Sequence, residues 1–315
     1  MGSESLKLPV IELSNLKHES ETWESTKVQV RQALEDYGCF EATFDQIPVD
    51  LRESVLDGLK QLFDLPLEVK LCNKSERPYH GYTGQVPTLP LYESLGIEDV
   101  ASPHQIHSFT NLMWPQGNPS FSSKSVQSYI EKLWELDKIV RKVVLESCGV
   151  GKHVEDHMRS TNYVVRVQKY DSPPNHETQP GLLPHLDLNI LTILQQLNHV
   201  AGLEILTKHA NKWITARPSS PYSFFVFAGI SFHAWTNGRL HSPLHRVTMN
   251  GDEARYSIGL FSVPKPGSLI KAPDELVDED HPLLYKPFDH HKFIEFLNSQ
   301  AVATSSDALK NYCGA

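Results

Sequence analysis

Apolar residues recur with a helical period through much of the first half of the sequence. The clearest case is the segment 122–148, which is followed by Gly149 and carries one apolar stripe made of Val126, Tyr129, Ile130, Leu133, Leu136, Val140, Val143 and Val144. The segments 22–37 and 50–63 have the same period and end before Gly38 and Pro66. A short strand is predicted over 8–13. The stretch 73–117 is rich in Pro, Gly and Tyr, which predicts a long ordered loop region.

After Ser160 the period changes from helical to strand-like. Seven short runs rich in Val, Ile, Phe and Leu are separated by turn residues, over 162–170, 189–197, 202–206, 212–216, 222–228, 244–249 and 255–263. Many short strands at this spacing predict a sandwich or a barrel. The double-stranded β-helix, a cupin-like jelly roll, fits best because its interior opens at one end as a ligand cavity.

These patterns predict a mostly β core with flanking α-helices. A length of 315 residues fits one large domain or a core with a helical elaboration. We expect a mainly helical elaboration over 1–120 and a long helix over 121–160 that packs on the sheet. The jelly-roll core would occupy 161–270. A helical tail would follow over 271–315, with a short helix at 288–297 near the mouth of the barrel.

The acidic balance of the chain limits its expected partners. A net charge of −9 argues against a nucleic acid or an anionic membrane surface. No run of 18 apolar residues is present, so no membrane span is expected. The N-terminal segment lacks an apolar signal core, and Leu6 breaks the myristoylation pattern. The four cysteines lack CxxC spacing, so the reducing cytoplasm is the expected compartment.

The most informative chemistry lies in His185, Asp187 and His245. Two imidazoles and one carboxylate can take three adjacent corners of an octahedron and leave three open, which suits Fe(II) that must also bind a chelating acid and O2. A His-x-Asp tripeptide alone is weak evidence because it arises often by chance. Its combination with a later His and with Arg255 and Ser257, each inside or beside a strand-like run, is hard to explain as background.

These residues resemble the plant-type 2-oxoglutarate/Fe(II)-dependent dioxygenases, and the resemblance extends over essentially the full length. The stretches LPVIELS (8–14), DYGCF (36–40) and FDLP (63–66) look like that family's N-terminal signatures, and NGRLHSPLHRV (237–247) looks like its second-histidine segment. The similarity is greatest to the branch with glucosinolate side-chain dioxygenases, a steroidal glycoalkaloid hydroxylase and deoxypodophyllotoxin synthase. The stretches FTNLMWP (109–115) and HPLL (281–284) carry that closer likeness.

The resemblance implies an iron site and a cosubstrate site. His185, Asp187 and His245 would bind Fe(II), and 2-oxoglutarate would chelate it through its keto acid end. Arg255 and Ser257, which share one face of a strand, would bind the distal carboxylate of 2-oxoglutarate. For Arg255 a surface ion pair is the competing interpretation, and Ser257 makes it the weaker one.

Two further positions belong to the expected cosubstrate site. Tyr170 matches a family tyrosine that also donates to 2-oxoglutarate, although an ordinary strand tyrosine remains an alternative. Gln168 occupies a place where an Asn is usual in the family. The expected oxidant is O2, and ascorbate is the expected reductant.

The substrate pocket is predicted from strand alternation and from family correspondence. Beyond Arg255 and Ser257 the same face continues to Phe261 and Val263. The predicted pocket residues are Phe261, Val263, Leu186, Arg166 and Trp114. Such a lining, mostly apolar with one cation, suits a mainly apolar or aromatic small molecule. Core packing competes at each position, and with equal weight at Phe261 and Trp114.

Two departures from the family pattern bear on the substrate more than on activity. Gly229-Ile230 stands where Gly-Asp is common, and Leu186 stands where Thr is common between the two ligands. The expected function is oxidation of a plant specialised metabolite by a monomeric enzyme, with hydroxylation the commonest outcome in the family and release of succinate and CO2. Ring closure, desaturation or O-demethylation are alternatives. A catalytically silent binding protein is an alternative of another class, and a zinc hydrolase would leave Arg255 without a purpose.

Overall fold

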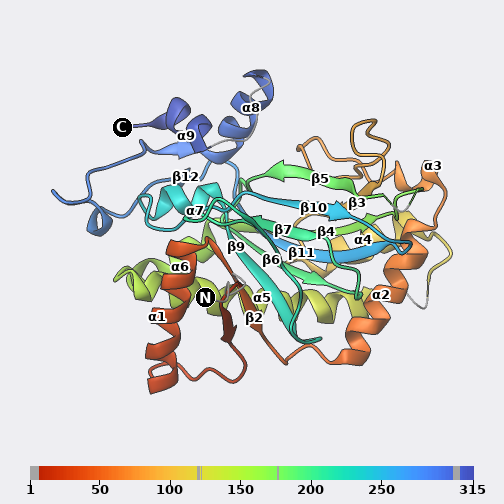
Figure 1. Cartoon of the computed structure of the whole chain (residues 1–315), viewed down its shortest axis with the longest axis horizontal. Coiled ribbons are helices and arrows are strands. Elements are labelled where there is room, and N and C mark those ends of the chain that lie inside the picture. The colour runs from red at the N-terminus through yellow and green to blue at the C-terminus, as the bar shows by residue number, and fades with distance from the viewer. Residues whose placement is uncertain (1–6, 119–120, 122, 176, 301–305) are drawn as a thin grey trace, which may run out of the picture.

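The computed structural model describes residues 7–118, 121, 123–175, 177–300 and 306–315. Its core is a pair of β-sheets with helices around them (Figure 1). The N-terminal part contains β1 (Val10–Glu12), α1 (Glu21–Asp36), β2 (Cys39–Thr43), α2 (Val49–Phe63), α3 (Leu67–Lys70), β3 (Tyr92–Ile97), α4 (Pro103–Met113) and α5 (Ser123–Ser147). A 3-10 helix over Gly151–His153 and α6 (Val154–Arg159) lead into the β-rich part.

Eight consecutive strands pass back and forth between the two sheets. They are β4 (Thr161–Tyr170), β5 (Gln179–His185), β6 (Leu191–Gln196), β7 (Leu203–Leu206), β8 (Trp213–Thr215), β9 (Ser223–Ala228), β10 (His245–Met249) and β11 (Arg255–Pro264). The major sheet has the order β1-β2-β9-β6-β11-β4-β3, and the minor sheet has the order β5-β10-β7-β8. This alternation is that of a double-stranded β-helix, so the predicted fold class is confirmed.

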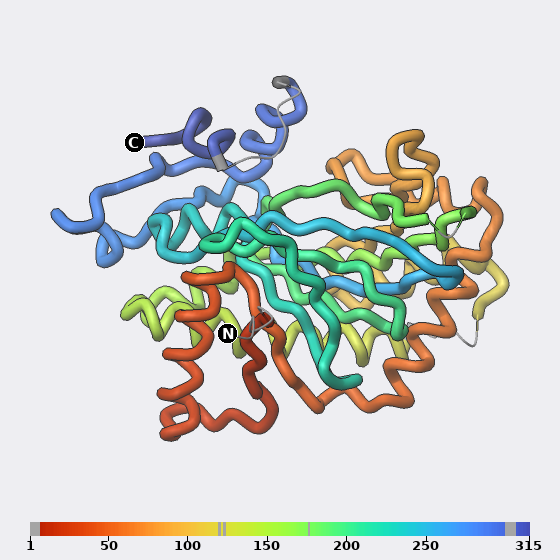
Figure 2. The backbone as a smooth tube through the Cα atoms, in the orientation of Figure 1, coloured from red at the N-terminus to blue at the C-terminus, as the bar shows by residue number. Residues whose placement is uncertain are grey.

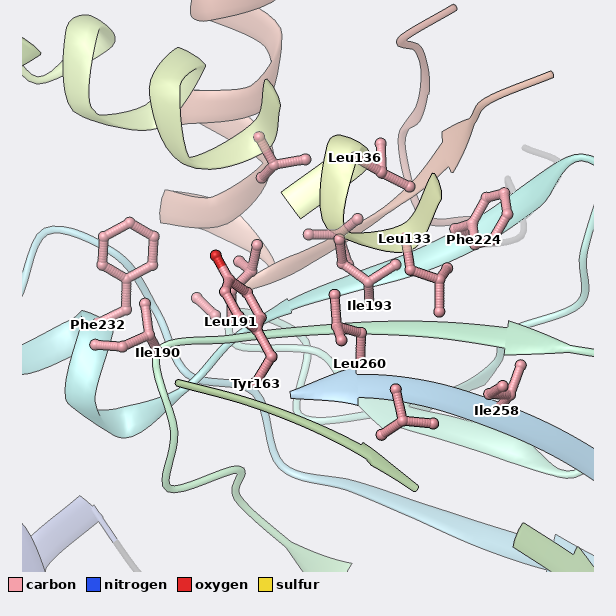
Figure 3. Close-up of a cluster of buried hydrophobic side chains, with 14 of the residues drawn as sticks. Leu133, Leu136, Tyr163, Ile190, Leu191, Ile193, Phe224, Phe232, Ile258 and Leu260 are labelled. Carbon is pink, nitrogen blue, oxygen red and sulfur yellow. The ribbon is translucent and has the colours of Figure 1, made fainter. Parts of the chain in front are cut away.

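The long helix α5 covers the outer face of the major sheet, where it packs on β6 and β11. Leu133 and Leu136 of this helix meet Ile193, Ile258 and Leu260 of the sheet in a buried apolar layer (Figure 3). Because side chains alternate along a strand, Ile258 and Leu260 face the helix while the odd-numbered residues of β11 face the other sheet. The packing of α5 therefore decides which side chains of β11 enter the barrel.

The structure corrects two sequence-based expectations. The predicted loop region over 73–117 contains β3, which extends the major sheet beside β4, and α4, which begins with Pro103 in its first turn. The strand β5 was missed because Pro180 and Pro184 interrupt it. Both prolines are tolerated because β5 is an edge strand of the minor sheet and pairs only with β10.

The C-terminal segment lies beside α7 (Ile230–Trp235), at the end of the barrel where β5 ends (Figure 2). It contains β12 (Leu269–Ile270), a 3-10 helix over Asp274–Leu276, β13 (Phe288–Asp289), α8 (His290–Gln300) and α9 (Ser306–Cys313). The short helix expected over 288–297 corresponds to α8, and α9 was not predicted. The ring of His290 lies 3.0 Å from Ser231 Oγ, which donates to Leu188 O in the segment after β5. Among the described residues, no helix is long and apolar enough to cross a membrane.

Candidate metal and cosubstrate site

Register between two strands brings together the three predicted metal ligands. His185 ends β5, His245 begins β10, and the two are direct partners in the antiparallel pairing. Asp187 follows β5 by two residues, and its Oδ1 lies 3.9 Å from His185 Nε2 and 3.8 Å from His245 Nε2. One candidate ligand atom from each residue lies within 4.8 Å of the other two. This is a compact set of two imidazoles and one carboxylate, as the sequence predicted.

Hydrogen bonds orient the two imidazoles for metal binding. His185 Nδ1 lies 2.8 Å from Leu183 O, and His245 Nδ1 lies 3.2 Å from Pro243 O. Since a carbonyl only accepts, each Nδ1 carries the proton and each Nε2 has a free lone pair directed towards Asp187. Burial, together with the neighbouring His245, lowers the pKa of His185 to about 4, so this imidazole is neutral as a ligand must be.

Asp187 is held through its carboxylate and its backbone carbonyl by two residues that sequence reasoning did not assign to the site. Thr192 Oγ1 donates to Asp187 Oδ2 at 2.6 Å, which leaves Oδ1 facing the two imidazoles. The amide of Ile230 donates to the backbone carbonyl of Asp187 at 2.7 Å. This hydrogen bond is made by the backbone amide of Ile230 and not by its side chain. The presence of Ile in place of the family's usual Asp at position 230 therefore leaves the hydrogen bond to Asp187 intact. No local sequence signal marks Thr192.

Arg255 is fully buried, and no acidic side chain within the described part of the chain pairs with it. Arg255 is the first residue of β11, and its Nη1 donates to Ser257 Oγ at 3.1 Å. Nε and Nη2 are buried without a hydrogen-bond partner among the described residues. Burial lowers the pKa of Arg255, yet a guanidinium stays charged in proteins. A buried cation with two free donors is costly unless an anion joins it. The site therefore fits the distal carboxylate of 2-oxoglutarate.

Ser257, Gln168 and Tyr170 lie around the guanidinium of Arg255. Ser257 Oγ donates to Gln168 Oε1 at 2.9 Å, so Gln168 orients this hydroxyl. Tyr170 is the direct register partner of Arg255, and its ring lies 5.3 Å from the guanidinium carbon. Burial raises the pKa of Tyr170, so its hydroxyl stays protonated and can donate. Tyr170 also packs with Tyr92, Val247 and Met249 in a buried apolar cluster.

Cross-strand pairing places most of the predicted pocket residues on one face. Residues directly opposite each other share a face, and the rows across β6, β11 and β4 are Gln196–Ser257–Gln168, Leu194–Gly259–Arg166 and Thr192–Phe261–Val164. Phe261 and Val263 therefore lie on the same face as Arg255, with Phe261 the more exposed of the two. Arg166 lies on this face as well, between Gly259 and Gly96.

Two other predicted pocket residues have different surroundings. Leu186 sits between the two ligands of the His-x-Asp tripeptide and is buried within the main apolar core. Trp114 follows α4 and packs on Phe121, with ring centroids 4.8 Å apart, beside the helical layer. The structure places Phe261, Val263 and Arg166 on one face, and the assignment of Trp114 to the pocket stays a prediction.

Comparison with known proteins agrees with this geometry. The family model for the 2OG-Fe(II) oxygenase superfamily matches residues 156–264. The family model for the N-terminal region of non-haem dioxygenases in morphine synthesis matches residues 8–115. The probable 2-oxoglutarate-dependent dioxygenase AOP1.2 of Arabidopsis thaliana is 45% identical over 98% of this chain and 96% of its own length.

Two solved structures of dioxygenases for auxin oxidation are also similar. The rice enzyme is 29% identical, with a TM-score of 0.85 over 98% of this chain and 100% of that chain. The Arabidopsis thaliana enzyme, solved with 2-oxoglutarate, is 27% identical, with a TM-score of 0.79 over 87% of this chain and 99% of that chain.

Proposed function

Because the chain belongs to the 2OG-Fe(II) oxygenase superfamily, we propose that this 2-oxoglutarate-dependent dioxygenase hydroxylates a specialised plant metabolite. The observation that carries the proposal is the convergence of His185, Asp187 and His245 within 4.8 Å. Fe(II) bound there would supply O2 activation coupled to conversion of 2-oxoglutarate to succinate and CO2. The chain's own residues must bind both substrates, orient the target C–H bond and exclude water.

Binding and orientation of the cosubstrate fall to the residues near the start of β11. Arg255 supplies two buried nitrogens, Nε and Nη2, that are free to donate to the distal carboxylate, Ser257 adds a hydroxyl, and Tyr170 lies beside them. A charge-assisted pair of this kind is strong because it is buried and its geometry is fixed. It would hold 2-oxoglutarate with its keto acid end directed towards the triad. The buried apolar cluster around Tyr170 would limit the access of water to this site.

Hydroxylation is proposed over ring closure, desaturation or O-demethylation because it is the commonest outcome in the family. The four outcomes differ in how the target bond is placed, which fine positioning in the pocket decides. Phe261 and Val263, on the same face as Arg255, are the proposed substrate-contacting residues, with Arg166 as their polar neighbour. We propose that the enzyme acts as a monomer in the cytoplasm, where its four free cysteines would remain thiols.

A catalytically silent binding protein gains little support. The Gly229-Ile230 departure favoured that alternative, but Ile230 still holds the Asp187 carbonyl through its amide. The buried side chain of Ile230 packs in the core, away from solvent. All three candidate ligands and the basic anchor are retained.

The proposal is tested by succinate release from 2-oxoglutarate in the presence of Fe(II), with ascorbate as the proposed reductant. The purified chain is incubated with and without fractions of a plant metabolite extract. Mass spectrometry then identifies any compound that gains one oxygen atom in step with succinate. Asp187→Ala protein serves as the matched control. Stimulated succinate release with an oxygenated product supports the proposal, whereas tight binding of 2-oxoglutarate without turnover under any fraction favours the silent binder.

A further inference from the structure

We propose that Arg166 binds an acidic group of the substrate, and that the substrate is an organic acid with an apolar or aromatic body. This inference rests on the proposed function and adds the chemical class of the substrate. Four observations carry it: the partners that Arg166 lacks, the face on which it lies, its distance from the cosubstrate anchor, and the apolar wall beside it.

Among the described residues, the buried Lys and Arg side chains are paired with carboxylates except on the face that lines the barrel. Lys70 Nζ lies 2.7 Å from Glu93, and Arg141 Nη1 lies 3.4 Å from Asp137. Arg166 is only 8% exposed and Arg255 is fully buried, yet neither has an ion pair among the described residues. Burying an unpaired charge is strongly unfavourable, so both guanidinium groups call for an anion from outside the chain.

The guanidinium of Arg166 has one nitrogen engaged and another free. Nη2 donates to the hydroxyl of Ser94 and, at 3.4 Å, to Thr83 Oγ1, and both of these acceptors are neutral. Nη1 is buried with no hydrogen-bond partner among the described residues. Hydroxyl groups position the guanidinium without neutralising it. The free Nη1 is therefore available for a carboxylate oxygen.

Register places Arg166 on the inner face and away from the 2-oxoglutarate anchor. Its direct partners are Gly259 on β11 and Gly96 on β3, so neither neighbouring position carries a side chain of its own beside the guanidinium. Arg255 lies four residues before Gly259 on β11, which separates the two positions by about 13 Å along the sheet. One small diacid would have to span this distance to occupy both guanidinium groups. Two separate anions fit the arrangement better.

Arg166 also lies within reach of the candidate metal ligands. Thr192, which donates to Asp187, lies on β6, two strands away from β4. It belongs to the row Thr192–Phe261–Val164, which is next to the row Leu194–Gly259–Arg166 on the same face of the sheet. Two strand spacings correspond to about 10 Å. An acid held by Arg166 would thus extend its body, several bonds long, across β11 towards the triad. The oxidised carbon would lie away from the acidic group.

An aromatic ring forms the wall beside this anchor. A Cβ at Gly259 would come within 2.8 Å of Phe261 Cε2 and 3.4 Å of Leu194 Cδ1, so these two side chains cover the glycine opposite Arg166. The position combines a cation with an apolar surface. Such a lining selects an acid whose body is apolar or aromatic over a sugar acid or another polyhydroxylated molecule.

The test compares an acid with its neutral isostere in the intact protein. Phenylacetate and 4-phenylbutyrate are titrated against phenylacetamide and 4-phenylbutyramide by calorimetry, with Mn(II) and saturating 2-oxoglutarate present. We expect the wild type to bind at least one acid about tenfold or more tightly than its amide, since a charge-assisted contact is made only by the acid. Arg166→Gln should remove the preference, and Arg166→Lys should keep part of it, with the affinity for 2-oxoglutarate unchanged in both.

Arg52→Gln is the matched control, because Arg52 has a buried unpaired Nε but donates to backbone carbonyls at the end of β6. It should keep the full preference for the acid. Equal binding of acids and amides by the wild type overturns the proposal without any variant, which covers the case that Arg166→Gln does not fold. Weaker binding of 2-oxoglutarate by Arg166→Lys would also overturn it. A wild type that fails to bind 2-oxoglutarate at all would instead refute the proposed function.

Discussion

His185 and His245 are direct partners across the antiparallel pair β5–β10, and their ring centroids lie 4.2 Å apart. One end of the minor sheet thus presents two imidazoles side by side, and the turn after β5 adds the carboxylate of Asp187. Phe227 of the major sheet stacks on His245 with a centroid separation of 4.8 Å. The ligand set is therefore held by both sheets of the barrel.

Loss of the basic anchor should weaken cosubstrate binding. In Arg255→Ala the free Nε and Nη2 donors and the positive charge are removed. We expect binding of 2-oxoglutarate to weaken by roughly 1.5–3 kcal/mol, about ten- to a hundredfold, because a charge-assisted contact is lost. Calorimetric titration of the metal-loaded protein measures this change. Unchanged affinity would refute the role given to Arg255.

Loss of the hydroxyl that supports the carboxylate should weaken metal binding. In Thr192→Val the 2.6 Å hydrogen bond to Asp187 Oδ2 is lost while the shape of the side chain is kept. Residues that orient a ligand typically contribute about ten- to a hundredfold to metal affinity, and the same range is expected here. Thr207→Val is the control, because Thr207 is also buried but bonds to Lys212. Equal metal affinities of the two variants would contradict the positioning role.

Truncation of the pocket ring should change which substrates are accepted. Phe261 lies on the same face of β11 as Arg255, but six residues further along the strand. Phe261→Ala should therefore alter the ranking of metabolites in the succinate-release assay and leave the dissociation constant for 2-oxoglutarate unchanged. The reverse result, with cosubstrate affinity reduced and the ranking intact, would place the ring outside the substrate pocket.

Removal of a side chain between α5 and the major sheet should destabilise the fold. Leu260 is 1% exposed and lies in the apolar layer shown in Figure 3. Leu260→Ala should lower the free energy of unfolding by about 2–5 kcal/mol through lost burial and a residual cavity. Leu269→Ala, at a position 63% exposed, should change it by less than about 0.5 kcal/mol. Urea denaturation compares the two, and a smaller loss at Leu260 would contradict the packing described.

Hydrophobic periodicity predicted most of the elements because they are regular and amphipathic. The apolar stripe over 122–148 became α5, and the seven expected strands became β4 and β6 to β11. The edge strand β5 escaped notice because Pro180 and Pro184 mask its pattern. The strand β3 and the helix α4 lie in a segment whose Pro, Gly and Tyr content resembles a loop. In these segments tertiary pairing with β4 and α5 outweighs local preference.

The candidate site was predictable where a short motif carries its chemistry. His185, Asp187, His245, Arg255 and Ser257 could be named from residue types and order. Thr192 and Ser94 could not be named, since nothing local shows which hydroxyl will face a buried carboxylate or guanidinium. The assignment of Trp114 to the pocket stays a prediction, and its ring packs on Phe121. Long-range register, which no local pattern contains, decides these cases.

The central claim is that His185, Asp187 and His245 together hold Fe(II) for chelation by 2-oxoglutarate. It is tested most directly by anaerobic titration of the purified chain with Fe(II) and 2-oxoglutarate, followed by the visible charge-transfer absorption that arises when the keto acid chelates ferrous iron. One Fe(II) per chain with this absorption is expected for the wild type and for Asp64→Ala, an exposed carboxylate at the end of α2. Asp187→Ala should bind Fe(II) about a hundredfold or more weakly while remaining folded. Full Fe(II) binding and absorption in Asp187→Ala would contradict the claim.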